Sequence, residues 1–389
     1  MKKGPIALIL GIRPDVIRAC IIIREMRSAL PNDFILIWSG QHYSDNLKDI
    51  FFRELGIASP DYELNIEGES DAELSANVIT KLSGLLQKTN TSLAVFLGDT
   101  NTVLGTIAAA QLNIPIIHIE GCMRSYDWRM PEEKYRTIAD HLSDRIYAYL
   151  PDYKLQGISE GISESNILVT GNPIVDVLNE YFLNEKLRLK DEEVDQLLAS
   201  KYKTTRSNYL VMTCHRRENV ENEFSLNRII SLAKATSELV LFPASYRTQK
   251  MLLNYKIKLP DNIVMVDPIG YLELLELFVN SNGILTDSGT VVEEASILGI
   301  PSIQMRTSTE RPEVYISNSS VKFDPHTESS IQETLTKFNE LKGSKWNHLF
   351  GDGSASYRIV EDLITCFNTD NFSGHNPKNF GEFSARSFM

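Results

Sequence analysis

Long hydrophobic runs are missing from this sequence. No apolar stretch approaches the roughly 20 residues that a transmembrane helix needs. The N-terminal apolar run is short and ends at Gly11-Ile12-Arg13-Pro14, without the small-residue site at which a signal peptide is cleaved. We therefore expect no membrane partner, and we interpret residues 5–10 as a buried first strand.

Cysteines are few and widely spaced. The chain has 4 of them, at Cys20, Cys122, Cys214 and Cys366, and none forms the paired spacing of a zinc site. We therefore expect no bound metal. Scattered cysteines are also typical of a reducing compartment, which predicts a cytoplasmic protein.

A block of lysine and arginine is missing as well. The formal net charge is -12 at pH 7. An acidic chain without a basic patch is poorly suited to bind nucleic acid or an anionic membrane, so we expect neither as a partner. A ligand that carries phosphate would need cations placed close to it.

Short apolar runs alternate with longer amphipathic segments along most of the 389 residues, a length that suits two domains rather than one core. The alternation predicts an α/β fold with parallel sheets covered by helices on both faces. Strands are predicted at 5–10, 34–39, 93–97, 114–119, 145–149, 167–170, 208–213, 238–242, 263–266, 283–286 and 301–305. Helical patterns lie between most of them, for example at 14–29, 71–88, 102–112, 224–236, 271–280 and 290–298.

The alternation breaks once, at a charged stretch with little apolar surface. We therefore predict a first Rossmann-like domain at 1–170 and a second at 206–353, joined by a linker region at 171–205. Residues 354–368 are predicted to form a closing helix, and 369–389 a loosely ordered tail.

Polar side chains follow many of the predicted strands, on the edge where parallel sheets bind ligands. In the first half, Asp99 and Glu120 end strands and Glu132 and Glu133 follow; in the second half, His215 follows a strand. Grouped carboxylates favour general acid/base chemistry. Helix caps and solvated loops explain each residue singly. Glu120 is the hardest to explain in this way, because a carboxylate at the end of an apolar strand is costly unless it is paired or used.

A second group of residues fits a nucleoside diphosphate. Ser288 and Gly289 open an apolar helix, and a helix N-terminus with a serine cap and exposed N–H groups binds phosphate. Glu294 lies further along this helix, where a carboxylate could meet ribose hydroxyls. Three arginines are candidate cations for the diphosphate: Arg13, Arg18 and Arg136. An ordinary helix cap and surface ion pairs are the alternative explanation.

The fingerprint of a nicotinamide-binding loop is missing. No G-x-G-x-x-G follows a strand, because Arg13 and Pro14 occupy the first turn. A P-loop and a G-x-S-x-G motif are missing too. We therefore expect no cofactor.

Taken together, these motifs resemble the non-hydrolysing UDP-N-acetylglucosamine 2-epimerase family across residues 5–366. The order and spacing of the matching stretches make the resemblance specific. They are G-I-R-P-D-V-I-R (11–18), G-Q-H-Y (40–43), G-D-T-N-T (98–102), H-I-E-G (118–121), R-M-P-E-E-K-Y-R (129–136), T-G-N-P-I-V-D (170–176), H-R-R-E-N (215–219), T-D-S-G-T-V-V-E-E-A (286–295), T-E-R-P-E (309–313) and G-D-G-S-A-S-Y-R-I (351–359).

The resemblance implies two Rossmann-like domains of GT-B type with a ligand cleft between them, a homodimer, and UDP and a UDP-linked 2-acetamido sugar as ligands. It implies that the reaction eliminates and re-adds UDP, without a cofactor. Its catalytic set maps onto Asp99, Glu120, Glu132 and His215, the last of these at the diphosphate. Its substrate-binding set maps onto Arg13, Arg18, Gln41, Arg136, Ser288, Gly289 and Glu294.

Two departures from the family pattern concern the substrate. Residues 125–131 are more similar to relatives that act on UDP-N-acetyl-L-fucosamine or on a UDP-2,3-diacetamido uronate. Ser245 stands where the family motif F-P-x-H-P-R has histidine, and the uncharged Asn77 lies near the position of a family arginine. In many bacterial members these two positions help to hold a second, activating UDP-GlcNAc. We therefore expect a single substrate site here.

Two other classes share this fold. A GT-B glycosyltransferase would use the nucleotide site but would not need Asp99, Glu120 and Glu132 together. A non-catalytic nucleotide-sugar sensor would tolerate losing these acids, and all three are present.

Overall fold

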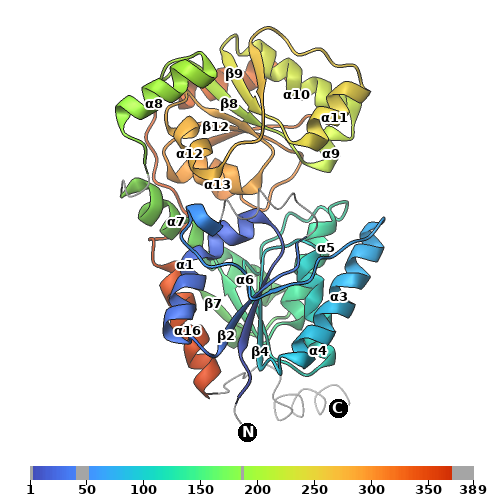
Figure 1. Ribbon diagram of the computed structural model, residues 1–389. Helices are drawn as coiled ribbons and strands as arrows, with labels where there is room; N and C mark the ends of the chain where they lie inside the picture. Colours follow the sequence, from blue (N-terminus) through green and yellow to red (C-terminus); the bar gives the residue numbers. More distant parts are fainter. Residues whose placement is uncertain (1–2, 41–51, 185–187, 370–389) are drawn as a thin grey trace. The chain divides into compact units, whose positions relative to one another are not determined.

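The computed structural model describes residues 3–40, 52–184 and 188–369. They form two compact units (Figure 1): the first comprises residues 1–179 and 351–389, and the second comprises 180–350. The chain passes from the first unit to the second at Asn179–Glu180 and returns at Phe350–Gly351. None of the described helices has the length and apolar character that a bilayer crossing requires.

The first unit is built on a sheet of seven strands in the order β3-β2-β1-β4-β5-β6-β7, in which every neighbouring pair is parallel. Both β1 and β4 are buried at every position, as expected for strands covered on two faces. The strands are β1 (Ile6–Leu10), β2 (Phe34–Trp38), β3 (Tyr62–Glu63), β4 (Leu93–Leu97), β5 (Ile116–Ile119), β6 (Arg145–Ala148) and β7 (Ile167–Val169).

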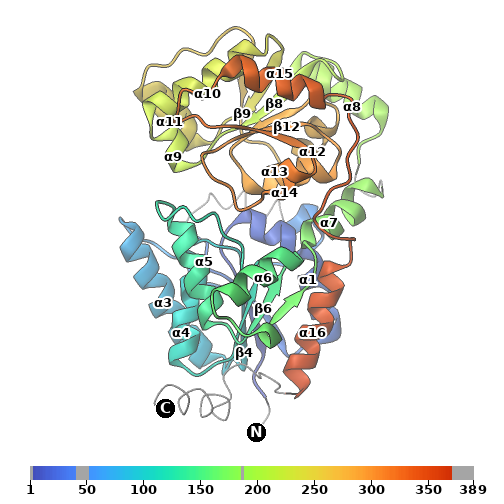
Figure 2. The ribbon, with the colours of Figure 1, turned by 180° about the vertical axis from the view of Figure 1, so that it is seen from behind.

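Helices cover both faces of this sheet (Figures 1 and 2). Side chains of α3, α4 and α5 share one apolar cluster with β1, β2, β4 and β5, while α1, α7 and α16 pack against one another. The helices are α1 (Arg13–Ala29), α3 (Asp71–Lys88), α4 (Gly105–Gln111), α5 (Pro131–Leu142), α6 (Pro151–Ser159), α7 (Pro173–Val177) and α16 (Ala355–Thr369), with two short 3-10 helices, η1 (Asn101–Leu104) and η2 (Glu164–Asn166). The π-helix η3 (Leu178–Leu183) follows α7 and contains the point at which the chain passes into the second unit.

The second unit repeats this architecture with six parallel strands in the order β10-β9-β8-β11-β12-β13. They are β8 (Tyr209–Thr213), β9 (Leu239–Pro243), β10 (Ile263–Val266), β11 (Ile284–Thr286), β12 (Ser302–Met305) and β13 (Ser320–Phe323). The helices are α8 (Asp191–Leu197), η4 (Leu198–Tyr202), α9 (Arg217–Val220), α10 (Glu223–Ala235), α11 (Tyr246–Asn254), α12 (Tyr271–Val279), α13 (Gly289–Ile297), α14 (Glu313–Ile316) and α15 (Ile331–Leu341).

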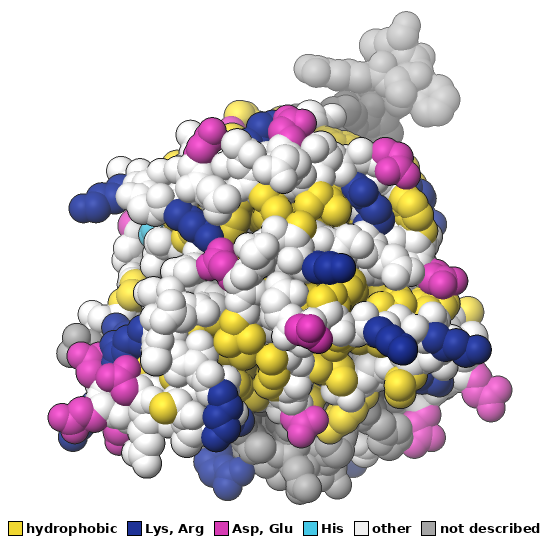
Figure 3. All heavy atoms as spheres, turned by 90° about the horizontal axis from the view of Figure 1, so that it is seen from above, with side chains coloured by type: hydrophobic (Ala, Val, Ile, Leu, Met, Phe, Trp, Pro, Cys, Tyr) yellow, Lys and Arg dark blue, Asp and Glu magenta, His cyan; other side chains and the backbone are white. Residues whose placement is uncertain are grey.

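Residues of α10, α11 and α15 form the main apolar cluster of the second unit with side chains from all six strands. In Figure 3, which views the molecule from above, Lys and Arg side chains are scattered among acidic and hydrophobic ones. This mixture of both charge signs is typical of a solvated surface.

Two strands are additional to those predicted from the sequence, β3 and β13. Both lie at an edge of their sheet. An edge strand is covered less completely, so its hydrophobic pattern is weaker; Lys322 in β13, for example, is exposed. The predicted helix at 102–112 divides into η1 and α4.

The helix that follows the second unit, α16, is fastened to the first unit by two carboxylates. Asp176 accepts hydrogen bonds from the first two backbone N–H groups of α16 at 3.2 and 2.5 Å. Asp362 accepts two hydrogen bonds from Arg145, from Nε at 2.9 Å and from Nη2 at 2.6 Å, and one from the Tyr147 hydroxyl at 2.9 Å. Because Arg145 and Tyr147 lie in β6, this cluster joins α16 to the sheet.

We expect Asp362→Asn to lower the free energy of unfolding of the first unit by about 1.5–3 kcal/mol, because hydrogen bonds to a charged group contribute this much. Amide hydrogen exchange of β6 in urea measures this unit separately. The control is Glu25→Gln, which breaks a half-exposed pair with the adjacent Arg24 and should change little. Equal effects of the two substitutions would contradict the prediction.

Candidate functional site

Each sheet reverses its strand order once, between β1 and β4 in the first unit and between β8 and β11 in the second. Parallel sheets bind ligands outside the carboxyl ends of the strands at such a point. Most of the predicted site residues follow these strands or their neighbours.

In the first unit, Glu120 follows β5 and forms an ion pair with Arg18 of α1. Both side chains are 5% exposed, so the pair is largely removed from water. Arg18 also lies 3.0 Å from Asp15, which accepts from the backbone N–H groups of Gly11 and Ile12. Burial raises the pKa of Asp15 to about 7, although the Arg18 guanidinium and these two N–H groups oppose the shift.

The backbone of Glu120 is strained. Its φ is 74°, in the left-handed region that residues other than glycine rarely adopt. The neighbouring Gly98, at φ 86°, follows β4, and a Cβ atom there would lie 3.1 Å from Asp15 and 3.4 Å from Arg18. Strain that the surroundings enforce is concentrated at functional sites, which supports the prediction for Glu120.

Asp99 follows β4 and forms an ion pair with Arg136 of α5. Arg136, 2% exposed, also lies 2.9 Å from Glu133. Glu133 is buried and accepts from the backbone N–H groups of Ser125 and Tyr126, so it anchors the preceding loop. Of the two adjacent glutamates, Glu133 therefore has this structural role, and Glu132 lies half-buried in the first turn of α5.

The structure thus brings four predicted residues together in two pairs, Glu120 with Arg18 and Asp99 with Arg136. Arg13 is the first residue of α1 and is half-buried. Gln41, which was predicted to bind substrate, lies outside the described residues.

In the second unit, Asp287 organises the loop after β8. It is fully buried and accepts from the backbone N–H groups of His215, at 3.0 Å, and Arg216, and from the Asn219 amide at 3.1 Å. The Nδ1 atom of His215 lies 3.4 Å from the same carboxylate, while 51% of its side chain is exposed. The imidazole is therefore oriented by Asp287 and accessible to a ligand.

The helix α13 begins directly after Asp287. Ser288 is its N-cap, and the Ser288 hydroxyl accepts from the backbone N–H of Val291 at 3.3 Å. Gly289 is the first helical residue. One turn further along, the Glu294 carboxylate accepts from the Tyr271 hydroxyl at 2.8 Å. This N-terminus has the N–H groups and the positive dipole end that attract phosphate.

Arg311 is a residue of this region that the sequence reasoning assigned no role. A Cβ atom at Gly289 would lie 2.6 Å from its guanidinium, so Arg311 packs against the first turn of α13. Its Nε atom donates to Glu293, about one turn further along α13, at 2.7 Å. The signal for Arg311 was present in the motif T-E-R-P-E at 309–313, but nothing in the spacing connected that motif to α13.

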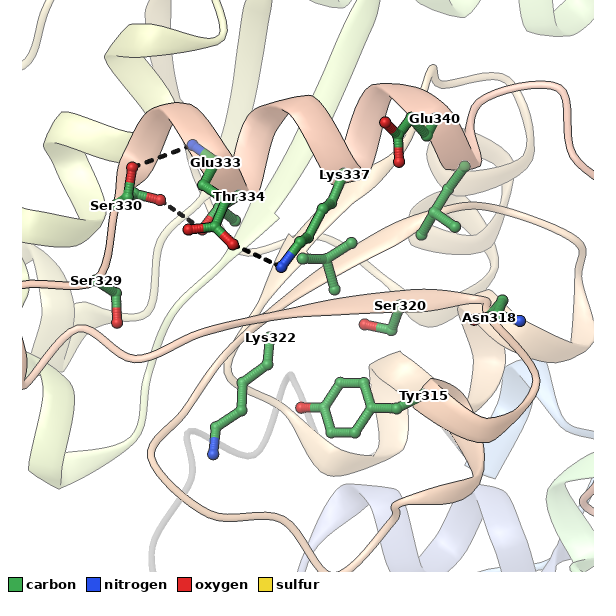
Figure 4. A pocket seen from close by; sticks show the side chains of 12 residues that line it. Tyr315, Asn318, Ser320, Lys322, Ser329, Ser330, Glu333, Thr334, Lys337 and Glu340 are labelled. Carbon is green, nitrogen blue, oxygen red and sulfur yellow. Dashed lines mark hydrogen bonds and ion pairs between the residues drawn. The ribbon is translucent and has the colours of Figure 1, made fainter.

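A separate pocket lies along the edge strand β13, with a volume of about 540 Å³. Figure 4 shows Glu333 and Lys337 reaching toward each other from α15, and Tyr315 and Lys322 on the other side of the strand. Its charged lining residues are Lys322, Lys337, Glu333 and Glu340, so positive and negative charges balance. This chemistry does not suit a diphosphate, and the pocket contains none of the predicted site residues.

Among the described residues, no three His, Cys, Asp or Glu side chains are grouped so that they could hold a metal ion.

Comparison with known proteins identifies the family. The family model described as UDP-N-acetylglucosamine 2-epimerase matches residues 24–364. The UDP-N-acetylglucosamine 2-epimerase of Methanococcus maripaludis is 37% identical over 366 residues, which cover 91% of this chain and 97% of the relative. The UDP-2,3-diacetamido-2,3-dideoxy-D-glucuronate 2-epimerase of Pseudomonas aeruginosa is 30% identical, covering 92% of this chain and 99% of the relative.

Among solved structures, the UDP-GlcNAc 2-epimerase of Methanocaldococcus jannaschii in complex with UDP-GlcNAc and UDP is similar, with a TM-score of 0.84 and 34% identity. The match covers 93% of this chain and 99% of that one. With the two parallel sheets, it confirms the predicted α/β fold of two Rossmann-like domains of GT-B type. The chain therefore belongs to the UDP-N-acetylglucosamine 2-epimerase family and is an isomerase.

Proposed function

We propose that this enzyme interconverts UDP-GlcNAc and UDP-ManNAc by eliminating and re-adding UDP. The observation that carries the proposal is the pair of carboxylates Asp99 and Glu120, which end the neighbouring strands β4 and β5, each with a buried arginine. The M. jannaschii relative, whose structure holds UDP-GlcNAc and UDP, supports the substrate.

The chemistry explains why grouped carboxylates are needed. The C2 proton is not acidic, and the acetamido group on C2 prevents oxidation of that carbon to a ketone. A carboxylate therefore removes the C2 proton while the C1–O bond breaks and UDP leaves with the electron pair, giving a 2-acetamidoglycal. UDP then re-forms the bond to C1 as an acid protonates the opposite face of C2. Atoms and electrons balance without an added oxidant.

We assign the acid/base work to Asp99, Glu120 and Glu132. One of these groups would remove the proton from one face of C2, and another would donate a proton to the opposite face. Arg18 and Arg136 would hold Glu120 and Asp99 in place and add positive charge for the departing diphosphate. Arg13 would add to this charge, and the uncharged amide of Gln41 would donate hydrogen bonds. Fixed charges of this kind stabilise a leaving group because they need no rearrangement during the reaction.

The UDP group is assigned to the second unit. The N–H groups at Ser288 and Gly289 would bind phosphate, and the exposed imidazole of His215 would contact the diphosphate. Glu294, oriented by Tyr271, would accept hydrogen bonds from the ribose. These groups would retain UDP while the glycal exists.

A second candidate function is the epimerisation of another UDP-2-acetamido sugar, such as the 2,3-diacetamido uronate of the P. aeruginosa relative. The observation that favours it is the loop at 125–131. Glu133 anchors the start of this loop. The loop carries the exposed side chains of Tyr126 and Trp128, which are 68% and 60% accessible to solvent. Parallel assays with the two sugars decide between the functions.

We expect the product formed in heavy water to carry deuterium at C2, because the proton removed by one carboxylate is replaced from another. Mass spectrometry of UDP-ManNAc made from UDP-GlcNAc, with no nucleotide added, measures this. Product that fully retained its original hydrogen would exclude elimination.

We expect Glu120→Gln and Asp99→Asn each to slow turnover by at least about a hundredfold, because an acid/base group contributes 10²–10⁴-fold. UDP affinity, measured by calorimetry, should change little because UDP is assigned to the second unit. Glu25→Gln is the control and should retain wild-type turnover. A variant that turned over near the wild-type rate would remove its residue from the catalytic set.

We expect hyperbolic kinetics and a reverse reaction that starts from the product alone. The Ser245 hydroxyl is used as the N-cap of α11, accepting from Thr248 N–H at 3.2 Å, and the Asn77 amide donates to the Glu67 carbonyl at 2.8 Å. A second diphosphate would therefore lack the histidine and arginine of the activated relatives and be poorly neutralised. Initial rates against UDP-GlcNAc test this, and sigmoidal curves would show that a second site persists.

A further inference from the structure

His118 is a fully buried histidine in β5, the strand that Glu120 follows. Its Nδ1 atom lies 2.7 Å from the Asp140 carboxylate, and its Nε2 atom lies 2.8 Å from the Gly98 carbonyl oxygen. A carbonyl oxygen can only accept, so Nε2 must carry a proton. The state of the whole ring then depends on whether Asp140 donates or accepts.

The partners of Asp140 settle which it does. Its other oxygen accepts from the backbone N–H of Cys122 at 2.9 Å and from Arg124 at 2.6 Å. Burial opposes ionisation, but the Cys122 N–H and the Arg124 guanidinium on this oxygen both favour the charged carboxylate, whatever the state of His118. A carboxylate in this state only accepts, so Nδ1 carries a proton too.

We infer that His118 is an imidazolium and acts as a positioning residue, tying together the strand ends that carry Asp99 and Glu120. One ring N–H donates a hydrogen bond to the carbonyl oxygen of Gly98, the residue directly before Asp99. The other holds Asp140 of α5, the helix that also supplies Arg136 to Asp99. Glu120 lies two residues beyond His118. The ring therefore joins β4, β5 and α5 at one point.

Two glycines make room for this clamp, by which we mean the hydrogen bonds of His118 to Gly98 and Asp140. A Cβ atom at Gly121 would lie 2.6 Å from Asp140 Oδ1 and 3.3 Å from His118 Nδ1. Gly98 presents its carbonyl to His118 while its Cα packs beside Arg18 and Glu120. The left-handed backbone of Glu120 lies between these contacts. We attribute the persistence of that strained conformation to the clamp, because strain survives only where the surroundings enforce it.

The charges around the ring favour its protonated form. Asp140 of α5 faces it directly, Glu120 contributes from the end of β5, and Arg124 lies behind Asp140 and is itself paired with Glu160. On the α1 side, Asp15 and Arg18 face Gly98. Although burial lowers it, the hydrogen bond and charge of Asp140 raise the pKa of His118 above 6.5.

The first test observes the protonation state without reference to activity. In protein labelled with ¹⁵N-histidine, we expect His118 at pH 7 to show two slowly exchanging ring N–H groups. The signals are assigned by their loss in His118→Gln or, if that variant does not fold, by their contacts to Gly98 and Asp140. A single N–H at Nε2 would mean that Asp140 carries the proton, and would overturn the inference.

The second test separates positioning from folding and rests on the proposed function. His118→Gln should lower kcat about tenfold to a hundredfold, as expected when reacting groups are slightly misplaced, while KM changes less than threefold. His141→Gln, at an exposed histidine of α5, the helix that carries Asp140, is the matched control. An unchanged kcat in folded His118→Gln would contradict the positioning role. A wild-type enzyme that epimerised no UDP-sugar would instead refute the proposed function and leave the NMR result standing.

The third test uses the sign of the pKa shift. A histidine whose folded pKa is raised contributes stability fully below the ordinary value of about 6.5 and loses it as pH rises through the folded value. The difference in urea midpoint between wild type and His118→Gln should therefore shrink as pH rises above about 6.5, since groups that do not contact His118 cancel in the comparison. A difference that grew with pH would overturn the inference.

Discussion

A buried carboxylate must be paired with a cation or hydrogen-bonded, and much of the first unit is arranged to meet that requirement. Glu120, Asp140 and Glu133 are all nearly inaccessible to water. Each has a cationic partner delivered by a helix, a strand or a loop: Arg18 for Glu120, Arg136 for Glu133, and Arg124 together with His118 for Asp140. Removing one partner would leave an uncompensated buried charge. The loops at the carboxyl edge of this sheet are therefore held by the same ion pairs that the proposed chemistry needs.

Much of this organisation was predictable from sequence. The central strands read as continuous apolar runs because both faces of each sheet are covered, and helices such as α3 and α13 begin at clear caps, Ser70 and Ser288. Asp99, Glu120 and Ser288 could be selected as candidate site residues, because a polar residue at the end of a buried strand or at a helix start has a structural or functional role there. The edge strands β3 and β13 could not be recognised from the sequence, since a strand covered on fewer sides shows little periodicity.

The pairing of charges was beyond sequence reasoning for a different reason. Arg18 and Glu120 are 102 residues apart, and Asp99 and Arg136 are 37 apart. Their contacts depend on the strand order β1-β4-β5, which no local pattern records. Of the adjacent pair Glu132 and Glu133, sequence alone favours neither for the anchoring role. Only the fold shows that Glu133 turns back to the backbone at Ser125 and Tyr126.

The packing of charged groups also limits which residues can replace the glycines near the proposed site. At Gly98 and Gly121 in the first unit and at Gly289 in the second, a single added carbon would meet a charged or polar side chain within 3.3 Å. At each position the missing side chain lets a charged group approach the backbone: Asp15 and Arg18 at Gly98, Asp140 at Gly121, and Arg311 at Gly289. The first two groups surround the proposed acids, and the third lies under the proposed phosphate site. Close approach of fixed charges to backbone is what makes an electrostatic environment rigid enough to favour a transition state. These glycines are therefore as much a part of the proposed chemistry as the charged residues they admit.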